Sequence, residues 1–314
     1  MFQHIKDLQF DARVSRPDPR FAQMLLDQFG GGNGELKAAM QYFVQAFGCR
    51  RSNPDKYDLL MDVATEEFSH LEIVGATITM LLDGVNGEVK NAAEGNLVAQ
   101  MGAHAVRKTD VVAQALNDPR LLIESGGGPM VTDSLGVPWS GAFVNANGDL
   151  TVDLRSNIAA ESRAKIVYER LLEFTDDLHV QDTLRFLMTR EIAHFQQFAA
   201  ALETIEPNFP PGILQGDLRF THAYFNMSNG PDDARGPWNQ GRGPWPDGEE
   251  WEYIEHPAAE VAETAGQTEK TPAGHQRDAK QTRKFEKALA TRRSREAKAG
   301  AGRGVMRWSD SVDG

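Results

Sequence analysis

The feature that most constrains the fold of this chain is a pair of Glu-x-x-His motifs, one running from Glu67 to His70 and the other from Glu191 to His194. Each motif interrupts a series of apolar residues spaced three and four apart, which is the spacing of one face of an α-helix. A face as apolar as this is expected to lie in a core. The sequence therefore predicts two helices that each carry a carboxylate and an imidazole into the interior.

Two further predicted helices each bring one glutamate, Glu35 and Glu161, onto an apolar face. Because each of them precedes a motif histidine by a similar number of residues, the chain reads as one helical hairpin used twice. Buried glutamates without partners cost several kcal/mol or become protonated, and metal ions resolve that conflict. One Glu from each of two helices and Glu-x-x-His from each of two others is the ligand set of di-metal four-helix bundles. Oxygen ligands with some imidazole suit manganese or iron.

The predicted fold is all-α, with a four-helix bundle around a di-metal core. Helical periodicity covers about 21–48 with a glycine-rich interruption, then 53–82, 153–177 and 180–204. The segment 85–152 is predicted to be an insertion between helices.

Turn and breaker residues predict the remaining parts of the chain. Asn147-Gly148, between two short apolar triplets, predicts a β-hairpin inside the insertion. The predicted domains are a catalytic bundle over 1–206 with an N-terminal arm over 1–20, an extended, proline-rich and aromatic-rich arm over 207–256, and a disordered polar basic tail over 257–314.

Composition excludes several classes of protein. The single cysteine, Cys49, excludes an intrachain disulfide and zinc sites that need two thiolates. The longest apolar run, Ile73 to Leu82, is too short for a transmembrane helix, and no secretory signal is visible, which predicts a cytoplasmic protein without a membrane partner. Residues 270–307 carry 12 Lys and Arg against 3 Asp and Glu, a net of +9 within a chain of −12. The rest, at −21, is a poor nucleic-acid binder.

The motif-bearing segments resemble the manganese (non-haem) catalase family. The matching strings are GELKAAMQY around Glu35, ATEEFSHLEIV around Glu67 and His70, SNIAAESRAK around Glu161, and REIAHF around Glu191. The stretch VTDSLGVPWSGAFVNANGDLTVDL is similar to that family's insertion, and the likeness covers about 1–255. The resemblance implies a ferritin-like bundle.

The resemblance also implies roles for individual residues. The implied manganese ligands are Glu35, Glu67, His70, Glu161 and His194, with Glu67 as the bridging carboxylate. Glu191 matches a glutamate that moves protons without binding metal, and Tyr42 matches a tyrosine beside the ligands. Glu66 points about 100° away from Glu67 around the helix axis and is expected outside the ligand set or at the surface.

A calcium site and an assembly are implied in the same way. Asp58 and Asp62 match the two helix carboxylates of a family calcium site, and Asn226, Ser228 and Gly230 match the loop that completes it. The family forms hexamers, and residues 207–255 are similar to its intersubunit arm.

The implied activity is the dismutation of hydrogen peroxide to water and dioxygen, with two manganese ions per subunit cycling between the (II,II) and (III,III) levels. Two alternatives stay open. Ligand types alone also fit a di-iron ferritin-like oxidase or peroxidase, and a structural or coat protein could retain the bundle without activity. The basic tail is either a solvated extension or a segment that docks on the acidic body of a neighbouring subunit.

Overall fold

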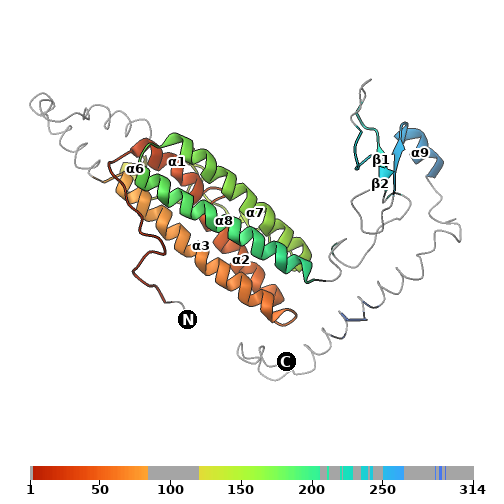
Figure 1. Ribbon diagram of the computed structural model, residues 1–314, viewed down its shortest axis with the longest axis horizontal. Helices are drawn as coiled ribbons and strands as arrows, with labels where there is room; N and C mark the ends of the chain where they lie inside the picture. The colour runs from red at the N-terminus through yellow and green to blue at the C-terminus, as the bar shows by residue number, and fades with distance from the viewer. Residues whose placement is uncertain are drawn as a thin grey trace, which may run out of the picture. The chain divides into compact units, whose positions relative to one another are not determined.

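The computed structural model describes residues 3–83 and 120–205, and beyond them 211, 220, 222–228, 235–239, 241–242, 250–264, 287, 290, 291 and 294. The chain divides into two compact units, one over 1–209 together with 304–314 and one over 210–303. The described elements of the first unit are helical (Figure 1). They are α1 (Pro19–Phe29), α2 (Glu35–Cys49), α3 (Pro54–Leu81), α6 (Arg120–Ile123), the 3-10 turn η1 (Gly141–Phe143), α7 (Leu150–Leu171), the 3-10 turn η2 (Leu172–Phe174) and α8 (Leu178–Glu203).

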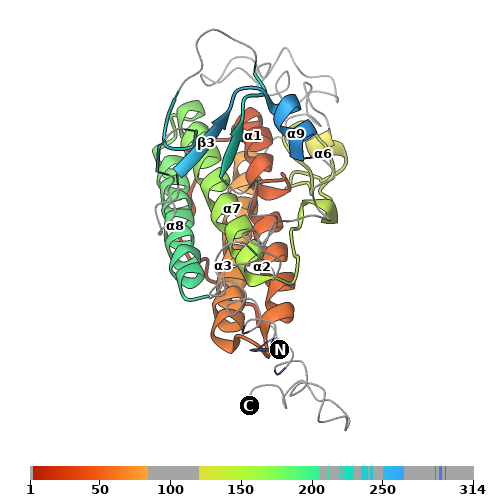
Figure 2. The same cartoon turned by 90° about the vertical axis from the view of Figure 1, so that its right-hand side faces the viewer.

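The first unit is a bundle of four long helices, which confirms the predicted fold class. Helix α2 packs along α3 and α7 packs along α8, so the bundle consists of two helical hairpins (Figure 2). Helix α1 packs against α3 and α7 at one end of the bundle. The glycine-rich interruption in the first predicted helix is the corner between α1 and α2. No helix among the described residues is long and apolar enough to cross a membrane.

Helix starts in the bundle are specified locally by capping residues. Asp149 accepts hydrogen bonds from the backbone N–H groups of Thr151 and Val152 at the start of α7, and Asp177 accepts one from His179 at the start of α8. At the start of α2, a Cβ on Gly34 would lie 2.6 Å from the carbonyl oxygen of Asp27. Glycine at position 34 therefore allows the tight corner that places Glu35 in the first turn of α2.

The interior of the bundle has two apolar clusters with a polar layer between them. One cluster lies at the end formed by α1, the C-terminal half of α3 and the N-terminal part of α8. The other lies at the opposite end, with residues of α2, the N-terminal half of α3 and the C-terminal end of α8. Along α3, Glu67 and His70 fall between the two sets, and along α8 Glu191 and His194 do the same. The polar residues of the two motifs therefore lie in a buried layer between the two apolar clusters.

The predicted hairpin around Asn147-Gly148 is wrong in position. Residues 141–143 form the turn η1, and Leu150 already belongs to α7. Gly148, at a φ of +70°, makes the turn that leads into the cap at Asp149. The side chain of Asp153 accepts hydrogen bonds from the backbone of Asn147 and Gly148. The turn at these two residues therefore leads into helix α7 instead of connecting two strands.

A small antiparallel pairing does occur earlier in the insertion. Thr132 and Pro138 form an isolated antiparallel bridge, and the N–H of Trp139 donates to the carbonyl of Val131 at 2.9 Å. Gly136, at a φ of +78°, lies in the connecting turn. The possible helix predicted near 97–107 falls outside the described residues.

The described residues before α1 form an extended N-terminal arm that lies along α3 and α8. His4 contacts Glu72 of α3 at 2.8 Å, and the side chain of Gln9 donates to Glu66 at the same distance. Further on, the backbone and hydroxyl of Ser15 donate to Asp177 at the start of α8. The arm therefore contacts both helices that carry a Glu-x-x-His motif, α3 through Glu66 and Glu72 and the start of α8 through Asp177.

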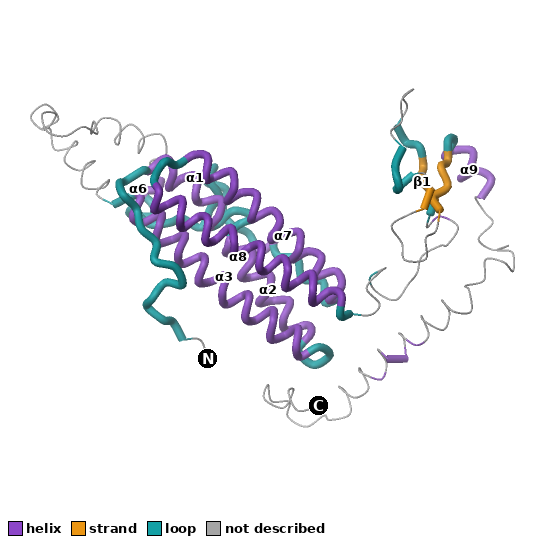
Figure 3. Tube along the Cα trace, viewed as in Figure 1, coloured by secondary structure: helices purple, strands orange, loops and turns teal. Residues whose placement is uncertain are grey.

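The second unit contains a three-stranded sheet (Figure 3) of β1 (Ala223–Phe225), β2 (Gly241–Arg242) and β3 (Glu250–Ile254), in the order β1-β3-β2. Strand β1 is parallel to β3 with Tyr224 opposite Tyr253, and β2 is antiparallel to β3. The rings of that pair stack with centroids 5.8 Å apart.

Helix α9 (Pro257–Thr264) forms where the sequence predicted the start of a disordered tail. Proline is in the first helical position, where its missing N–H costs nothing, and the carbonyl of His256 accepts bonds from Ala259 and Glu260.

Candidate metal centre

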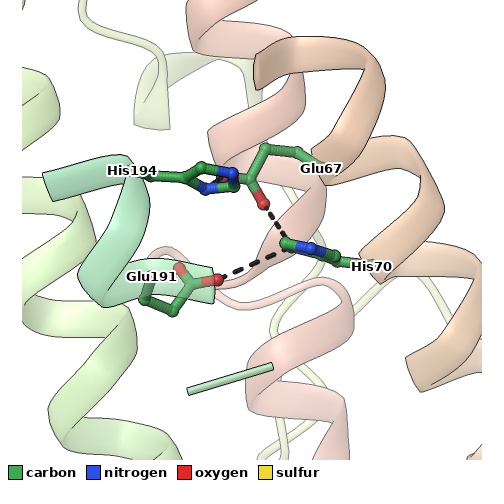
Figure 4. Close-up of side chains that lie close together, drawn as sticks. All are labelled: Glu67, His70, Glu191 and His194. Carbon is green, nitrogen blue, oxygen red and sulfur yellow. Dashed lines mark hydrogen bonds and ion pairs between the residues drawn. The ribbon is translucent and has the colours of Figure 1, made fainter. Parts of the chain in front are cut away.

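Two carboxylates and two imidazoles meet in the middle of the bundle. Glu67 and His70 come from α3, Glu191 and His194 come from α8, and one donor atom of each lies within 4.8 Å of the donor atoms of the other three. Figure 4 shows the four side chains converging from the two facing helices. All four are fully buried, so the two Glu-x-x-His motifs do face one interior site.

Glu67 lies between the two histidines. One of its oxygens is 3.0 Å from Nδ1 of His70, and the other is 2.9 Å from Nδ1 of His194. The two imidazole rings stack nearly parallel, with centroids 5.5 Å apart and an angle of 22°. A single carboxylate thus presents one oxygen to the Nδ1 side of each ring.

The glutamates of α2 and α7 flank this arrangement on opposite sides. An oxygen of Glu35 lies 3.8 Å from Nδ1 of His70, and an oxygen of Glu161 lies 3.9 Å from Nδ1 of His194. Both glutamates are 1 % exposed. The structure therefore brings together all five residues that the sequence suggested as manganese ligands, in two similar halves that share Glu67.

Glu191 occupies the same buried layer. One of its oxygens lies 3.6 Å from Nδ1 of His70, and neither oxygen accepts a hydrogen bond from the described residues. Burial, together with the charges of Glu35 and Glu67, raises the pKa of Glu191 well above its ordinary value. The ionised form of this carboxyl is therefore less favoured than that of an exposed glutamate.

Burial shapes the electrostatics of the flanking glutamates as well. It raises the pKa of Glu35 to about 7 and that of Glu161 to about 8, and the charge of Glu67 adds to both shifts. Such carboxyls are costly to ionise in an apolar interior unless a cation replaces the proton.

The donor atoms of this cluster fit a metal centre. Many of its buried oxygen and nitrogen atoms accept no hydrogen bond from the described residues although they cannot reach solvent. They are Glu35 Oε2, Glu67 Oε1, His70 Nε2, Glu161 Oε2, both oxygens of Glu191 and His194 Nδ1. Unsatisfied buried lone pairs are rare in proteins, and lone pairs that converge from four helices are what a cation needs.

Two tyrosines connect the two halves of the cluster through hydrogen bonds. The hydroxyl of Tyr42, from α2, donates to Glu161, and the hydroxyl of Tyr168, from α7, donates to Glu35. Each tyrosine therefore holds the glutamate of the opposite hairpin. The sequence singled out Tyr42 only. The signal for Tyr168 was present, because it follows Glu161 by seven residues as Tyr42 follows Glu35.

Lys37 is a buried cation beside this site that the sequence did not suggest. It is 2 % exposed, and its Nζ has no hydrogen-bond partner among the described residues. Burial lowers the pKa of Lys37 to about 8, with the charge of Arg163 acting in the same direction and those of Glu161 and Glu67 opposing it. The surroundings of Lys37 thus disfavour its charge overall.

Replacing Lys37 by methionine should stabilise the protein, because the change keeps an unbranched side chain and removes an unpaired buried ammonium. We expect Lys37→Met to raise the melting temperature by about 2–4 °C for each ~1 kcal/mol gained, measured by circular dichroism. Lys165→Met is the matched control, since Lys165 is partly exposed and pairs with Glu169 on the same helix. A lower melting temperature for Lys37→Met than for the control would show that Lys37 has a stabilising partner.

The residues suggested for calcium fall on both units. Asp58 and Asp62 lie on α3 and are exposed, whereas Asn226 and Ser228 belong to the second unit. Gly230 lies outside the described residues.

Comparison with known proteins gives one consistent result. The sequence profile of the manganese-containing catalases matches residues 1–290. A manganese catalase of Bacillus subtilis is 38% identical over 261 residues, which is 81% of this chain and 90% of that protein. A manganese catalase of Lactiplantibacillus plantarum is 31% identical over 268 residues, which is 82% of this chain and 93% of that protein.

Solved structures agree with the sequence relatives. The crystal structure of KatB, a manganese catalase from Anabaena, has a TM-score of 0.65 and 36% sequence identity, and it covers 82% of this chain and all of its own. The two halves of the buried site, the bundle that carries them and these relatives lead to the same conclusion: this chain belongs to the family of manganese-containing catalases.

Proposed function

We propose that this chain dismutes hydrogen peroxide at a pair of manganese ions held by Glu35, Glu67, His70, Glu161 and His194. Enzymes of this family decompose hydrogen peroxide, and manganese is the family's metal. The observation that carries the proposal is the position of Glu67, whose two oxygens lie 3.0 and 2.9 Å from Nδ1 of the two histidines. A carboxylate placed in this way is suited to bridge two ions, each with one histidine and one further glutamate.

The chemistry of the reaction divides between the metal pair and the protein. When bound, two manganese ions supply the two-electron store that dismutation requires, cycling between the (II,II) and (III,III) levels. Three ligand glutamates contribute three negative charges, which favour the higher level. The apolar clusters at both ends of the bundle limit the water around the site, which strengthens its electrostatic interactions.

Glu191 has the properties of the proton carrier in this reaction. Its carboxyl is buried beside His70, accepts no hydrogen bond from the described residues and has a raised pKa. Glu191 takes a proton from an entering peroxide and returns it to the departing oxygen. Tyr42 and Tyr168 hold Glu161 and Glu35 through their hydroxyls, so the flanking glutamates keep their free oxygens toward the centre of the site.

Metal analysis with an oxygen-evolution assay tests this function directly. We expect the purified protein to hold about two manganese ions per chain, as di-metal bundles do, and to release dioxygen vigorously from peroxide. Inductively coupled plasma mass spectrometry and an oxygen electrode measure the two quantities. Iron at near-stoichiometric levels, with slow oxidation of Fe(II) and no dioxygen, would establish the di-iron alternative. A protein that binds metal but neither releases dioxygen nor oxidises Fe(II) would have a structural role.

We also propose a bound calcium and a hexameric assembly, both supported by the family resemblance. We propose a cytoplasmic location as well, supported by the early acidic residues and the lack of an apolar stretch in residues 1–14. For calcium, Asp58 and Asp62 lie one turn apart on α3, so their carboxylates share one helix face. The same metal analysis includes calcium, and light scattering on the same preparation gives the number of chains in the assembly.

A further inference from the structure

Glu66 lies outside the ligand set and contacts it from α3. Its Oε2 lies 3.0 Å from Nε2 of His194, and its Oε1 lies 3.6 Å from Nε2 of His70. Arg190 donates to both oxygens, at 2.6 and 3.2 Å, and Gln9 of the N-terminal arm donates to Oε1 at 2.8 Å. One carboxylate on the outer side of the site thus reaches toward both histidine rings.

These contacts decide which nitrogen of His194 carries the proton. A carboxylate that is paired with Arg190 stays ionised and only accepts hydrogen bonds. Nε2 of His194, 3.0 Å from Glu66 Oε2, therefore carries a hydrogen, and in the neutral ring the lone pair is then on Nδ1. That lone pair is on the side of the ring where Glu67 and Glu161 lie, 2.9 and 3.9 Å from Nδ1.

The other hairpin has no carboxylate at the position that corresponds to Glu66. In α3 the residue four before the histidine is Glu66, and in α8 it is Arg190. The two positions face each other and form an ion pair. A second glutamate at 190 would add another negative charge to an already acidic site, whereas arginine neutralises Glu66 and fixes both of its oxygens.

We propose that Glu66 is a positioning residue that holds His194 in the orientation that binds metal, clamped by Arg190 and by Gln9 of the N-terminal arm. A carboxylate that accepts from the far nitrogen of a ligand histidine fixes the ring and makes the other nitrogen a better donor. The inference rests on the proposed function only in taking the two histidines as metal ligands.

The rate at which manganese leaves the protein tests the inference without relying on activity. We compare the metal-loaded wild type with Glu66→Leu, which fills similar space without accepting a hydrogen bond, and with Glu66→Gln, which restores one acceptor. In excess chelator, Glu66→Leu should lose manganese about 10–100-fold faster than the wild type, and Glu66→Gln should lie between them. The visible absorption of the oxidised manganese pair should shift in the same order.

The control and the contrary outcomes separate this inference from the proposed function. Glu72→Gln is the matched control, since Glu72 lies on the same helix and also contacts the arm, through His4, but no motif histidine. It should release manganese at the wild-type rate. Release from Glu66→Leu within about twofold of wild type, a difference of only ~0.4 kcal/mol, would overturn the positioning role. If Glu66→Leu does not fold, unchanged release from Glu66→Gln overturns it. A wild type that retains no metal would instead overturn the proposed function, and with it the premise.

Discussion

The Glu191→Gln protein should keep its manganese and lose most of its catalase activity. Glutamine has the size of glutamate but cannot accept and return a proton, and general acid–base catalysis of this kind contributes about 10²–10⁴-fold. We therefore expect the rate of dioxygen release per manganese to fall by about that factor. The manganese content should stay at the wild-type level, because Glu191 is not one of the five proposed ligands.

The alternative role for Glu191 is that of a metal ligand, and the manganese content of the Glu191→Gln protein tests it. Its carboxyl belongs to the group of four side chains whose donor atoms lie within 4.8 Å of one another, so it is also placed to bind metal. A Glu191→Gln protein that has lost manganese would identify it as a ligand and end its role as proton carrier. Glu203→Gln, an exposed change near the end of the same helix, is the control and should match the wild type.

The Glu67→Ala protein should lose both manganese ions and, with them, all measurable catalase activity. Each oxygen of Glu67 lies 3.0 Å or less from the Nδ1 atom of one histidine, so this single change removes a ligand from both halves of the site. Activity should fall by more than about 10³-fold, since the electron store is lost along with the positioning of the substrate. Mass spectrometry of the metal content and an oxygen electrode give the two readings.

One result would contradict the bridging role of Glu67. If Glu67→Ala retained one tightly bound manganese per chain, the two halves would bind metal independently and Glu67 would serve only one of them. Glu72→Ala is the control for a change on the same helix, because Glu72 is partly exposed and lies outside the cluster. Its metal content and activity should equal those of the wild type.

Helical periodicity was sufficient to find the bundle and its buried polar layer. The four long helices form close to the predicted segments, because an apolar face with three-and-four spacing has few alternatives to burial against its neighbours. The predicted ligand glutamates and histidines converge for the same reason. A charged residue at the centre of such a face must follow the face into the core.

Local turn signals were less reliable, and Asn147-Gly148 shows why. The same dipeptide suits a hairpin and a turn into a helix, since both use a glycine with positive φ. Asp149 decided between them by capping α7, and the Asp153 carboxylate then bound the backbone of the turn. Whether such a turn leads into a helix or a strand therefore depends on whether nearby side chains, here Asp149 and Asp153, can cap a helix start.

By itself, the sequence determined that this chain buries carboxylates on four helices and imidazoles on two of them, and hence that it needs a metal. Only the tertiary structure decided which partner each of these groups meets. Tyr168 reaches Glu35 and Glu66 reaches His194 across separate helices, and Lys37 is buried without a partner among the described residues. Periodicity specifies the face on which a side chain lies, but a contact between helices also depends on their relative rotation and height. Packing of the whole bundle sets both of these.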